Sequence, residues 1–214
     1  MHSPETSRRG LRGLYAVTPT GLAPGILLQR VEQALAGGVA LVQYRDKSDD
    51  RLQRATTAGA LVTLCHRFGA RLIVNDDLVL ALAIDADGVH LGEDDGDLAT
   101  ARWALGFGKL LGASCYADFE RARNAASVGV DYVAFGAVFA SPTKPEAERA
   151  PLSLFARCRQ ELHIPCCAIG GITLANAPTV LAAGADLLAV VTDLFDAPDI
   201  ASRAAGYRLL FEEK

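Results

Sequence analysis

One pattern repeats along the 214 residues of this chain. A short apolar segment is followed by a polar turn, then by an Ala- and Leu-rich segment that usually ends at glycine. Such apolar segments predict β-strands, and the Ala/Leu-rich segments between them predict α-helices. The predicted strands are 14–17, 39–47, 71–74, 88–91, 110–114, 131–135, 166–169 and 187–191. Eight strand–helix units in a chain of this length predict an α/β fold, a (β/α)8 TIM barrel in a single domain.

An open, doubly wound sheet is the alternative architecture, but it seldom needs eight near-regular units. We expect residues 13–214 to form the barrel and residues 1–12 to be a flexible N-terminal tail, because the first ten residues are mostly polar. A helix is predicted at 24–36, since proline stands at its start and two glycines follow its end. Later helices have predicted N-cap residues, which are Ser48, Asp97, Asp118, Thr173 and Asp199.

Composition narrows the class of partner. The net charge is −4 and there is no basic block, which disfavours nucleic acid. No apolar run approaches the roughly 18 residues that a membrane span needs, and the N-terminus lacks a signal-peptide pattern. The five cysteines show no C-x-x-C spacing, so we expect buried reduced thiols. The expectation is a cytoplasmic protein that binds small molecules, with a homo-oligomer left open.

Unusual polar residues follow the predicted strands, one strand after another. Active sites of TIM barrels lie at the carboxyl ends of the strands. The residues found there are Lys47, Asn75, Asp76, Asp95, Ser114, Lys144 and Thr192. Residues chosen only for solubility would not favour one end of the barrel, so this end is the predicted site.

The segment 42–47 carries two cations. Strand alternation predicts that Gln43, Arg45 and Lys47 point one way, and that Tyr44 and Asp46 point away from the barrel interior. A guanidinium, an ammonium and an amide converging from one strand end suit a pyrophosphate. The alternative is a surface strand end with solvated charges.

Carboxylates follow two neighbouring strands. Asp76 and Asp95 stand at the ends of predicted strands three and four, where oxygen ligands suit Mg²⁺. The alternative is that these acids cap the short helices that follow. His90 lies inside an apolar strand, so a hydrogen-bonded core histidine is expected rather than a metal ligand.

Later loops supply candidates for a second phosphate. Gly170 and Gly171 follow strand seven, and Val191 and Thr192 follow strand eight, which is the common phosphate site of this fold. The connection 136–151 is the longest in the chain, and we expect it to be loosely ordered until it closes over bound phosphates. An ordinary exposed turn is the alternative. The loop residues that would contact phosphates are Ser141, Pro142, Thr143 and Lys144.

Five motifs occur in order, at 43–47, at 75–77, at 88–92 with Asp95, at 135–136 with 141–144, and at 168–172. As a set they resemble the thiamine-phosphate synthase family, from about residue 14 to residue 195. The resemblance implies a transferase that joins hydroxymethylpyrimidine diphosphate to a methyl-phosphoethyl thiazole, giving thiamine phosphate and diphosphate.

The resemblance also implies residue roles. Asp76 and Asp95 would bind Mg²⁺, and Arg45, Lys47, Ser114 and Lys144 would act in catalysis. The pyrimidine diphosphate would contact Gln43, Tyr44, Arg45, Asp46, Lys47, Asn75, Ser114 and Lys144. The thiazole phosphate would contact Ser141, Pro142, Thr143, Gly170, Gly171, Val191 and Thr192.

Three residues depart from the family pattern: Glu93 replaces the usual Gln, Ser141 the usual Thr and Thr192 the usual Ser. None removes a required chemical group. Two other functions remain alternatives. One is a thiazole tautomerase of the same superfamily, which needs no diphosphate site. The other is a non-catalytic regulator that binds thiamine phosphate, which would tolerate loss of the metal carboxylates.

Overall fold

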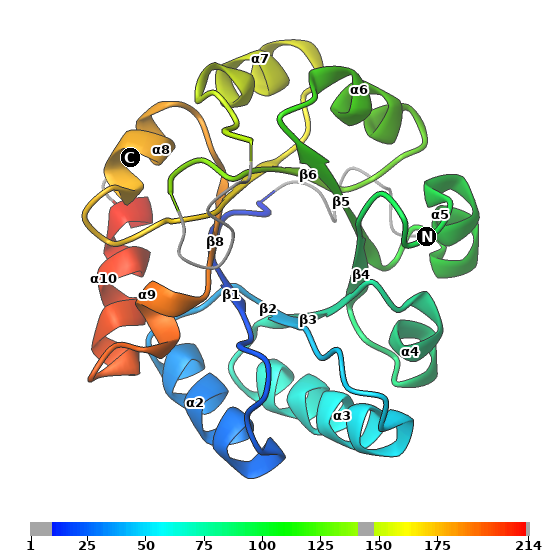
Figure 1. Ribbon diagram of the computed structural model, residues 1–214, viewed down its shortest axis with the longest axis vertical. Coiled ribbons are helices and arrows are strands. Elements are labelled where there is room, and N and C mark those ends of the chain that lie inside the picture. Colours follow the sequence, from blue (N-terminus) through cyan, green and yellow to red (C-terminus); the bar gives the residue numbers. More distant parts are fainter. Residues whose placement is uncertain (1–9, 141–147, 213–214) are drawn as a thin grey trace.

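The computed structural model describes residues 10–140 and 148–212. Parallel strands close into a barrel in chain order, and the helices surround it (Figure 1). The strands are β1 (Gly13–Val17), β2 (Leu41–Tyr44), β3 (Arg71–Asn75), β4 (Gly88–Leu91), β5 (Leu110–Tyr116), β6 (Tyr132–Phe135), β7 (Cys166–Ile169) and β8 (Leu187–Val190). The helices are α2 (Pro24–Ala36), α3 (Arg51–Arg67), α4 (Leu78–Ala83), α5 (Leu98–Leu105), α6 (Phe119–Ser127), α7 (Ser153–Glu161), α8 (Ala177–Ala182), α9 (Thr192–Phe195) and α10 (Ile200–Glu212). The predicted single-domain TIM barrel is confirmed.

Two apolar layers hold the barrel together. Every strand is nearly continuous in apolar residues, as expected where both faces of a parallel sheet are buried. In β2, Leu41 packs inside the barrel with Tyr15 and Ile73, whereas Val42 packs outside against the helices. Closure pairs β1 with β8, with Leu14 opposite Leu188. The sequence alternation therefore sets which side chains face the barrel interior.

The interior layer begins before the first strand. Leu11 is buried and packs with Tyr15 and Leu187 inside the barrel. It lies within the range expected to be a flexible tail, so that range was too long. Residues 1–9 lie outside the described part of the chain.

Most predicted helix starts are confirmed. Asp97, Asp118 and Asp199 each accept a hydrogen bond from a backbone N–H in the first turn of the helix that follows. The prediction for Ser48 is wrong, because Asp50 accepts the bond from Gln53 and α3 begins one residue later.

The prediction for Thr173 is also wrong. Its hydroxyl accepts from the Asn176 N–H in a turn, and α8 begins only at Ala177.

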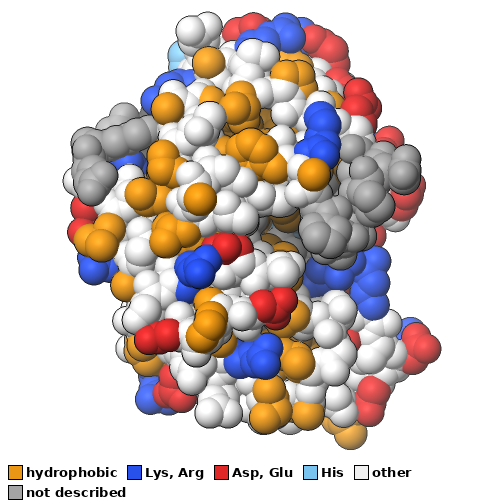
Figure 2. All heavy atoms as spheres, turned by 60° about the vertical axis from the view of Figure 1, so that its left-hand side comes forward, with side chains coloured by type: hydrophobic (Ala, Val, Ile, Leu, Met, Phe, Trp, Pro, Cys, Tyr) orange, Lys and Arg blue, Asp and Glu red, His pale blue; other side chains and the backbone are white. Residues whose placement is uncertain are grey.

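The outer surface mixes residue types. Figure 2 shows hydrophobic and charged side chains interspersed over the face that carries α8 and α10. Within residues 10–140 and 148–212, no helix is long and apolar enough to cross a membrane.

All five cysteines are free and buried, as the sequence predicted. Burial raises the pKa of the Cys65 and Cys115 thiols to about 12. Because the thiolate is the reactive form, the native protein should react negligibly with an aromatic disulfide reagent at neutral pH. Unfolding should expose all five thiols to rapid reaction. Stoichiometric reaction of any thiol in the native state, faster than global unfolding, would contradict this packing.

Candidate active site

A cavity of about 500 Å³ opens at the carboxyl ends of the strands β2, β3 and β4. Its walls come from the segment after β2, the end of β3, the start of α4, one residue of α3 and the loop after β4. The lining residues are Asp46, Lys47, Arg54, Asn75, Asp76, Asp77, Leu78, Val79 and Asp95. The structure thus brings together four residues that sequence position singled out, namely Lys47, Asn75, Asp76 and Asp95.

The segment after β2 carries the cations into this region. Its start is fixed by Thr18, whose N–H donates to the Gln43 carbonyl and whose hydroxyl accepts from the Arg45 N–H at 2.9 Å. Gln43 is buried and its side chain reaches Tyr15 inside the barrel, as alternation predicted. Strand pairing ends at Tyr44, so alternation no longer fixes the direction of the following side chains.

Asp46 keeps the predicted register at the rim of the cavity. Its side chain meets that of Tyr44, so both point the same way, as alternation predicted, and Asp46 also lines the cavity. Its carboxylate accepts hydrogen bonds from the Ser48 N–H and the Tyr44 hydroxyl, both at 2.8 Å. Burial opposes ionisation, yet these hydrogen bonds outweigh it and hold the pKa of Asp46 below its ordinary value. Asp46 is therefore a structured anion at the edge of the cavity.

Tyr44 points away from the barrel interior, as strand alternation predicted, and its contact with a substrate stays a prediction. Its ring is 2% exposed and packs in the layer between the barrel and the helices. Burial, together with the hydrogen bond to Asp46, raises the pKa of its hydroxyl. It therefore stays protonated and donates to Asp46, and its side chain is not among those that line the cavity.

Two carboxylates face each other across the ends of β3 and β4. Asp76 has a left-handed backbone with φ of +63°, and its N–H donates to the His90 carbonyl. Asp95 accepts a hydrogen bond from the Gly92 N–H at 2.8 Å. This close contact requires glycine at residue 92, because a β-carbon there would lie 2.6 Å from the Asp95 carboxylate. Burial and the neighbouring Asp95 raise the pKa of Asp76 to about 6. The two carboxylates therefore repel each other when both are ionised, and a bound cation would offset that repulsion.

This donor set fits Mg²⁺. The ion typically takes one or two carboxylates and completes its octahedral shell with water and substrate phosphates. In the part of the chain that the structure describes, no cluster of three or more His, Cys, Asp or Glu residues could hold a metal. A pair of carboxylates beside an open cavity is the arrangement expected for an ion shared with a substrate.

Asp77 has a different role from its neighbour. It caps α4 by accepting from the Leu80 N–H at 2.8 Å, and it forms an ion pair with Arg54 at 2.7 Å. Asp77 is therefore the residue that caps the helix after β3, whereas Asp76 faces Asp95.

Asp77→Ala should lower the free energy of unfolding by about 1–2 kcal/mol, because an N-cap and a partly buried ion pair are both lost. Urea unfolding measures this, and Asp94→Ala, which alters an exposed acid in the next loop, is the matched control. Equal stability of the two variants would show that the cap contributes nothing.

Ser114 lies farther inside the barrel mouth, on β5. Its hydroxyl is 2.9 Å from Nε2 of His90, which is itself buried. Burial lowers the pKa of His90 to about 4, so the imidazole is neutral near pH 7. The expectation of a hydrogen-bonded core histidine is confirmed.

The loops after β6 and β7 pack tightly together. The Val138 N–H donates to the Ile169 carbonyl and the Phe139 N–H donates to the Gly170 carbonyl, both at 3.0 Å. Gly171 has φ of +64°, and a β-carbon there would lie 2.3 Å from the Ala140 carbonyl oxygen. The two glycines are therefore required by the close approach of the loops, whatever else they bind.

The loop after β7 is also tied to α9. The Leu174 N–H donates to the Asp193 carboxylate at 3.2 Å, and Thr192 is the first residue of that helix. This places Gly171, Val191 and Thr192 in adjoining loops, but their contact with a phosphate stays a prediction. Ser141, Pro142, Thr143 and Lys144 lie outside the described residues, as does the rest of the segment 141–147 of the expected lid.

Sequence reasoning missed two residues at this end. Thr18 fixes the segment after β2, and Arg54 adds a second cation to the cavity wall, beside Lys47. Thr18 is a polar residue directly after a predicted strand, so the rule that found Lys47 would also have found it. Arg54 comes from the first turn of α3, and its placement depends on how that helix packs.

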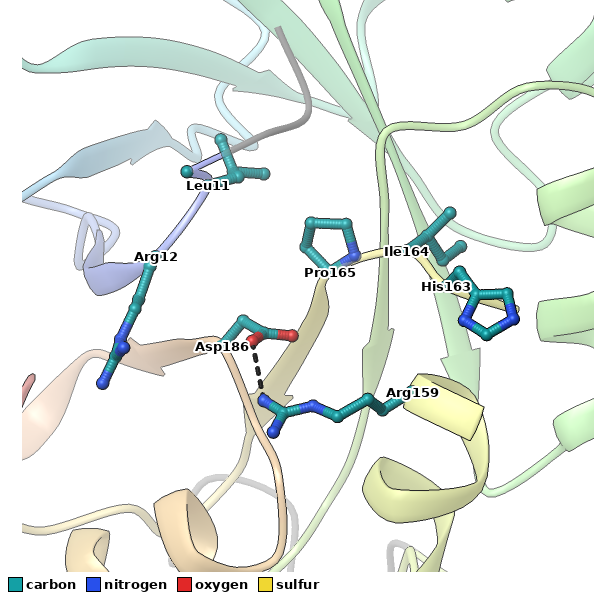
Figure 3. A pocket seen from close by; sticks show the side chains of 8 residues that line it. Leu11, Arg12, Arg159, His163, Ile164, Pro165 and Asp186 are labelled. Atoms are coloured by element: carbon teal, nitrogen blue, oxygen red, sulfur yellow. Dashed lines mark hydrogen bonds and ion pairs between the residues drawn. The ribbon is translucent and has the colours of Figure 1, made fainter. Parts of the chain in front are cut away.

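A second cavity, of about 370 Å³, lies at the opposite end of the barrel (Figure 3). Its lining comes from residues 10–12 and from the segments before β7 and β8, and Arg159 pairs there with Asp186 at 3.1 Å. Of the predicted site residues that the structure describes, none lines it. Features at this face of a TIM barrel commonly serve stability, and the cavity at the ends of β2, β3 and β4 carries the candidate chemistry.

Comparison with known proteins shows the family of the chain. A family model described as thiamine monophosphate synthase matches residues 14–194. A thiamine-phosphate synthase of Aromatoleum aromaticum is 57% identical over 94% of this chain and 97% of its own length. One of Methylobacillus flagellatus is 54% identical over 94% of this chain and 96% of its own.

Solved structures give the same result. A thiamine phosphate pyrophosphorylase from Pyrococcus furiosus superposes with a TM-score of 0.85, at 31% identity, over 96% of this chain and 98% of its own. A 3-hexulose-6-phosphate synthase from Salmonella typhimurium, at 15% identity and a TM-score of 0.71 over 93% of this chain and 98% of its own, shares the fold alone. With the family model matched over nearly its whole length, the chain belongs to the thiamine monophosphate synthase family.

Proposed function

We propose that this enzyme joins hydroxymethylpyrimidine diphosphate to a methyl-phosphoethyl thiazole, releasing thiamine phosphate and diphosphate. The observation that carries the proposal is the Asp76–Asp95 carboxylate pair, which shares one cavity with Lys47. Such a site combines two metal ligands with a cation, and this is the combination that a diphosphate leaving group requires. The names of the relatives support the same reaction.

Asp76 and Asp95 would hold Mg²⁺ in this site. When bound, the ion supplies positive charge against the oxygens of the departing diphosphate. Lys47 adds an ammonium at the cavity wall. Arg45, which follows β2, and Ser114, on β5, would supply further hydrogen-bond donors. Lys144, which the resemblance assigns to the same group, lies outside the described residues.

The reaction requires the protein to supply positive charge and to align the two substrates. The methylene carbon of the pyrimidine loses its C–O bond, and the electron pair leaves with the diphosphate. The thiazole nitrogen then forms the new C–N bond with its own lone pair, so no general base is needed. The cations neutralise the leaving group, and the two phosphate-binding ends hold the reactants in contact.

The histidine beside Ser114 does not imply acyl transfer. His90 contacts Ser114 with one ring nitrogen, but the other nitrogen meets the hydroxyl of Tyr132. A neutral tyrosine in that place does not stabilise an imidazolium as a carboxylate would. Ser114 therefore serves as a hydrogen-bonding group in this proposal.

The reaction itself provides the test. The purified enzyme, given both substrates and Mg²⁺, should form thiamine phosphate and diphosphate in equal amounts. A chelator should abolish both products, and readdition of Mg²⁺ should restore them. A thiazole tautomerase would isomerise its substrate without releasing diphosphate, and a regulator would bind thiamine phosphate without turnover. Either of these results would replace the proposed function.

Two further properties are proposed with it. A cytoplasmic location is supported by the five free, buried thiols, which suit a reducing compartment. The substrates are small molecules, and assembly into a homo-oligomer stays a prediction.

A further inference from the structure

Five uncharged side chains form a hydrogen-bonded chain across the barrel interior. Nε2 of Gln43 donates to the Tyr15 hydroxyl at 2.8 Å, which lies 2.8 Å from the hydroxyl of Tyr132. The Tyr132 hydroxyl is 3.1 Å from Nδ1 of His90, whose Nε2 is 2.9 Å from the Ser114 hydroxyl. The members come from strands β1, β2, β4, β5 and β6, so the chain connects opposite sides of the barrel.

The chain is enclosed and electrically neutral. Tyr15, Tyr132, His90 and Gln43 are each no more than 6% exposed. Burial raises the pKa of both tyrosines, so both stay protonated near pH 7, and each ring nitrogen of His90 meets a hydroxyl and not a carboxylate. In such surroundings an unmatched donor or acceptor costs free energy, which favours an arrangement that uses every proton.

Gly112 is what allows the middle of the chain to form. A β-carbon at this position would lie 2.1 Å from the Tyr132 ring and 2.6 Å from Nδ1 of His90. With glycine there, the two rings stack at 5.5 Å between centroids and 25° between planes. The backbone of β5 is therefore shaped around this pair.

The donors impose a direction on the chain. Nε2 of Gln43 can only donate, so the Tyr15 oxygen accepts and its own proton is available to Tyr132. Tyr132 can then donate to Nδ1 of His90, which places the imidazole proton on Nε2, facing Ser114. In the reverse direction Tyr15 would accept twice, and its own proton would be left without a partner inside the chain. Only the first direction gives the proton of each buried tyrosine a partner inside the hydrogen-bond chain.

We propose that Tyr15, Tyr132 and His90 are positioning residues whose one-directional hydrogen-bond chain presents Ser114 as a donor and the Gln43 carbonyl as an acceptor to the substrate. Because Ser114 accepts from His90, its own proton is free for an anionic oxygen of a diphosphate. Because Gln43 uses its amide nitrogen on Tyr15, its carbonyl oxygen suits an amino group on a heteroaromatic ring. This inference rests on the proposed binding of the pyrimidine diphosphate by Gln43 and Ser114.

Two variants separate the ends of the chain. Tyr132→Phe removes the proton that holds Nδ1 of His90, so both the tautomer and the orientation of Ser114 should relax. Tyr15→Phe should release Gln43 but leave Tyr132 able to donate to His90. Tyr207→Phe is the matched control, because it deletes a buried tyrosine hydroxyl that donates to Asp193 and is not part of the hydrogen-bond chain.

Nitrogen-15 NMR of the ligand-free enzyme shows which ring nitrogen of His90 carries the proton, and so measures the direction of the hydrogen-bond chain without turnover. The signals of His90 can be assigned among the four histidines by comparison with His90→Gln. We expect the proton on Nε2 in the wild type, in Tyr15→Phe and in Tyr207→Phe, and a mixture of tautomers in Tyr132→Phe. A wild-type proton on Nδ1 would overturn the proposed direction.

Kinetics then test whether the direction matters. Tyr132→Phe should lower kcat/KM for the pyrimidine diphosphate about tenfold, the scale of one neutral hydrogen bond. KM for the thiazole phosphate should change much less, and Tyr15→Phe should raise chiefly the KM for the pyrimidine substrate. If the wild type is active and both tyrosine variants match it, positioning is refuted. If Tyr132→Phe does not fold, the His90 tautomer of the wild type still tests the direction, and the KM of Tyr15→Phe for the pyrimidine substrate still tests the positioning. A wild type without synthase activity would instead refute the proposed function and leave the tautomer result standing.

Discussion

Asp76→Asn and Asp95→Asn should each lower turnover by roughly 10²–10³ and raise the Mg²⁺ concentration needed for half-maximal rate. The two acids face each other in one cavity, and Asp95 contributes to the raised pKa of Asp76. Asparagine keeps the shape and tolerates the left-handed backbone of residue 76, so the loss should come from the ligand and not from misfolding. Initial rates across a Mg²⁺ titration measure both effects.

Asp94→Asn is the control for these variants, because it removes an exposed acid from the same loop as Asp95. Its Mg²⁺ dependence should match the wild type. Asp76 and Asp95 would be excluded as ligands if their variants also kept the wild-type Mg²⁺ dependence.

The Asp76–Asp95 pair also predicts a pH dependence of stability that can be measured without substrate. The pKa of Asp76 is raised to about 6, so the folded metal-free protein holds this proton more tightly than the unfolded chain does. Its contribution to stability is therefore lost as pH rises from about 4 through about 6. Mg²⁺ competes with the proton, so it should raise Tm more at about pH 7 than at about pH 5. Asp76→Asn should remove that difference, and a Mg²⁺ effect independent of pH would contradict the assignment.

Arg45→Ala and Lys47→Ala should each lower kcat/KM for the pyrimidine diphosphate by roughly 10²–10³, the cost of one preorganised donor to a developing anion. Both residues follow β2, where Thr18 fixes the backbone, and Lys47 lines the cavity with the two acids. Lys47→Arg keeps the charge and should recover part of the loss. Steady-state kinetics with each substrate varied will separate the two binding ends, since KM for the thiazole phosphate should change little.

Asp46→Ala is the informative comparison. Asp46 lines the same cavity, but an anion does not attract a diphosphate, and its hydrogen bonds go to Tyr44 and Ser48. We expect a smaller loss than at either cation. Equal losses at Arg45, Asp46 and Lys47 would indicate that the segment acts through its conformation and not through its charges.

Helix boundaries were predictable where only one residue near the end of a helix could start or stop it. Proline at residue 24 and glycine at residue 37 bound α2 at both predicted ends. The start of α3 was ambiguous, because three capping residues stand in a row at positions 48–50, and only packing selects Asp50. β5 runs to Tyr116, beyond its predicted end, because pairing with β6 resumes after an irregularity between Ser114 and Tyr116. The four residues of α9 are too few to show a helical period.

The candidate site was predictable as far as topology determines it. Strand ends gather at one face of a barrel, so the sequence positions of Lys47, Asp76 and Asp95 were enough to place them together. Side-chain direction followed the strand alternation at Gln43, which reaches Tyr15 inside the barrel, and at Tyr44 and Asp46, whose side chains meet on the other side.

The interior hydrogen-bond chain could not be predicted from local pattern. Tyr15 and Tyr132 stand 117 residues apart, and nothing near either residue signals the other. Their contact depends on the closure of the barrel and on which side chains share its interior.

Calorimetric binding of inorganic diphosphate tests the central claim most directly, namely that the cavity at the ends of β2, β3 and β4 holds the leaving group together with Mg²⁺. The wild type should bind diphosphate with Mg²⁺ present and far more weakly without it. Lys47→Ala should weaken the binding while keeping its dependence on Mg²⁺, and Asp76→Asn should lose that dependence. Binding that is equally tight in the wild type and in both variants, with or without Mg²⁺, would place the diphosphate elsewhere and contradict the account.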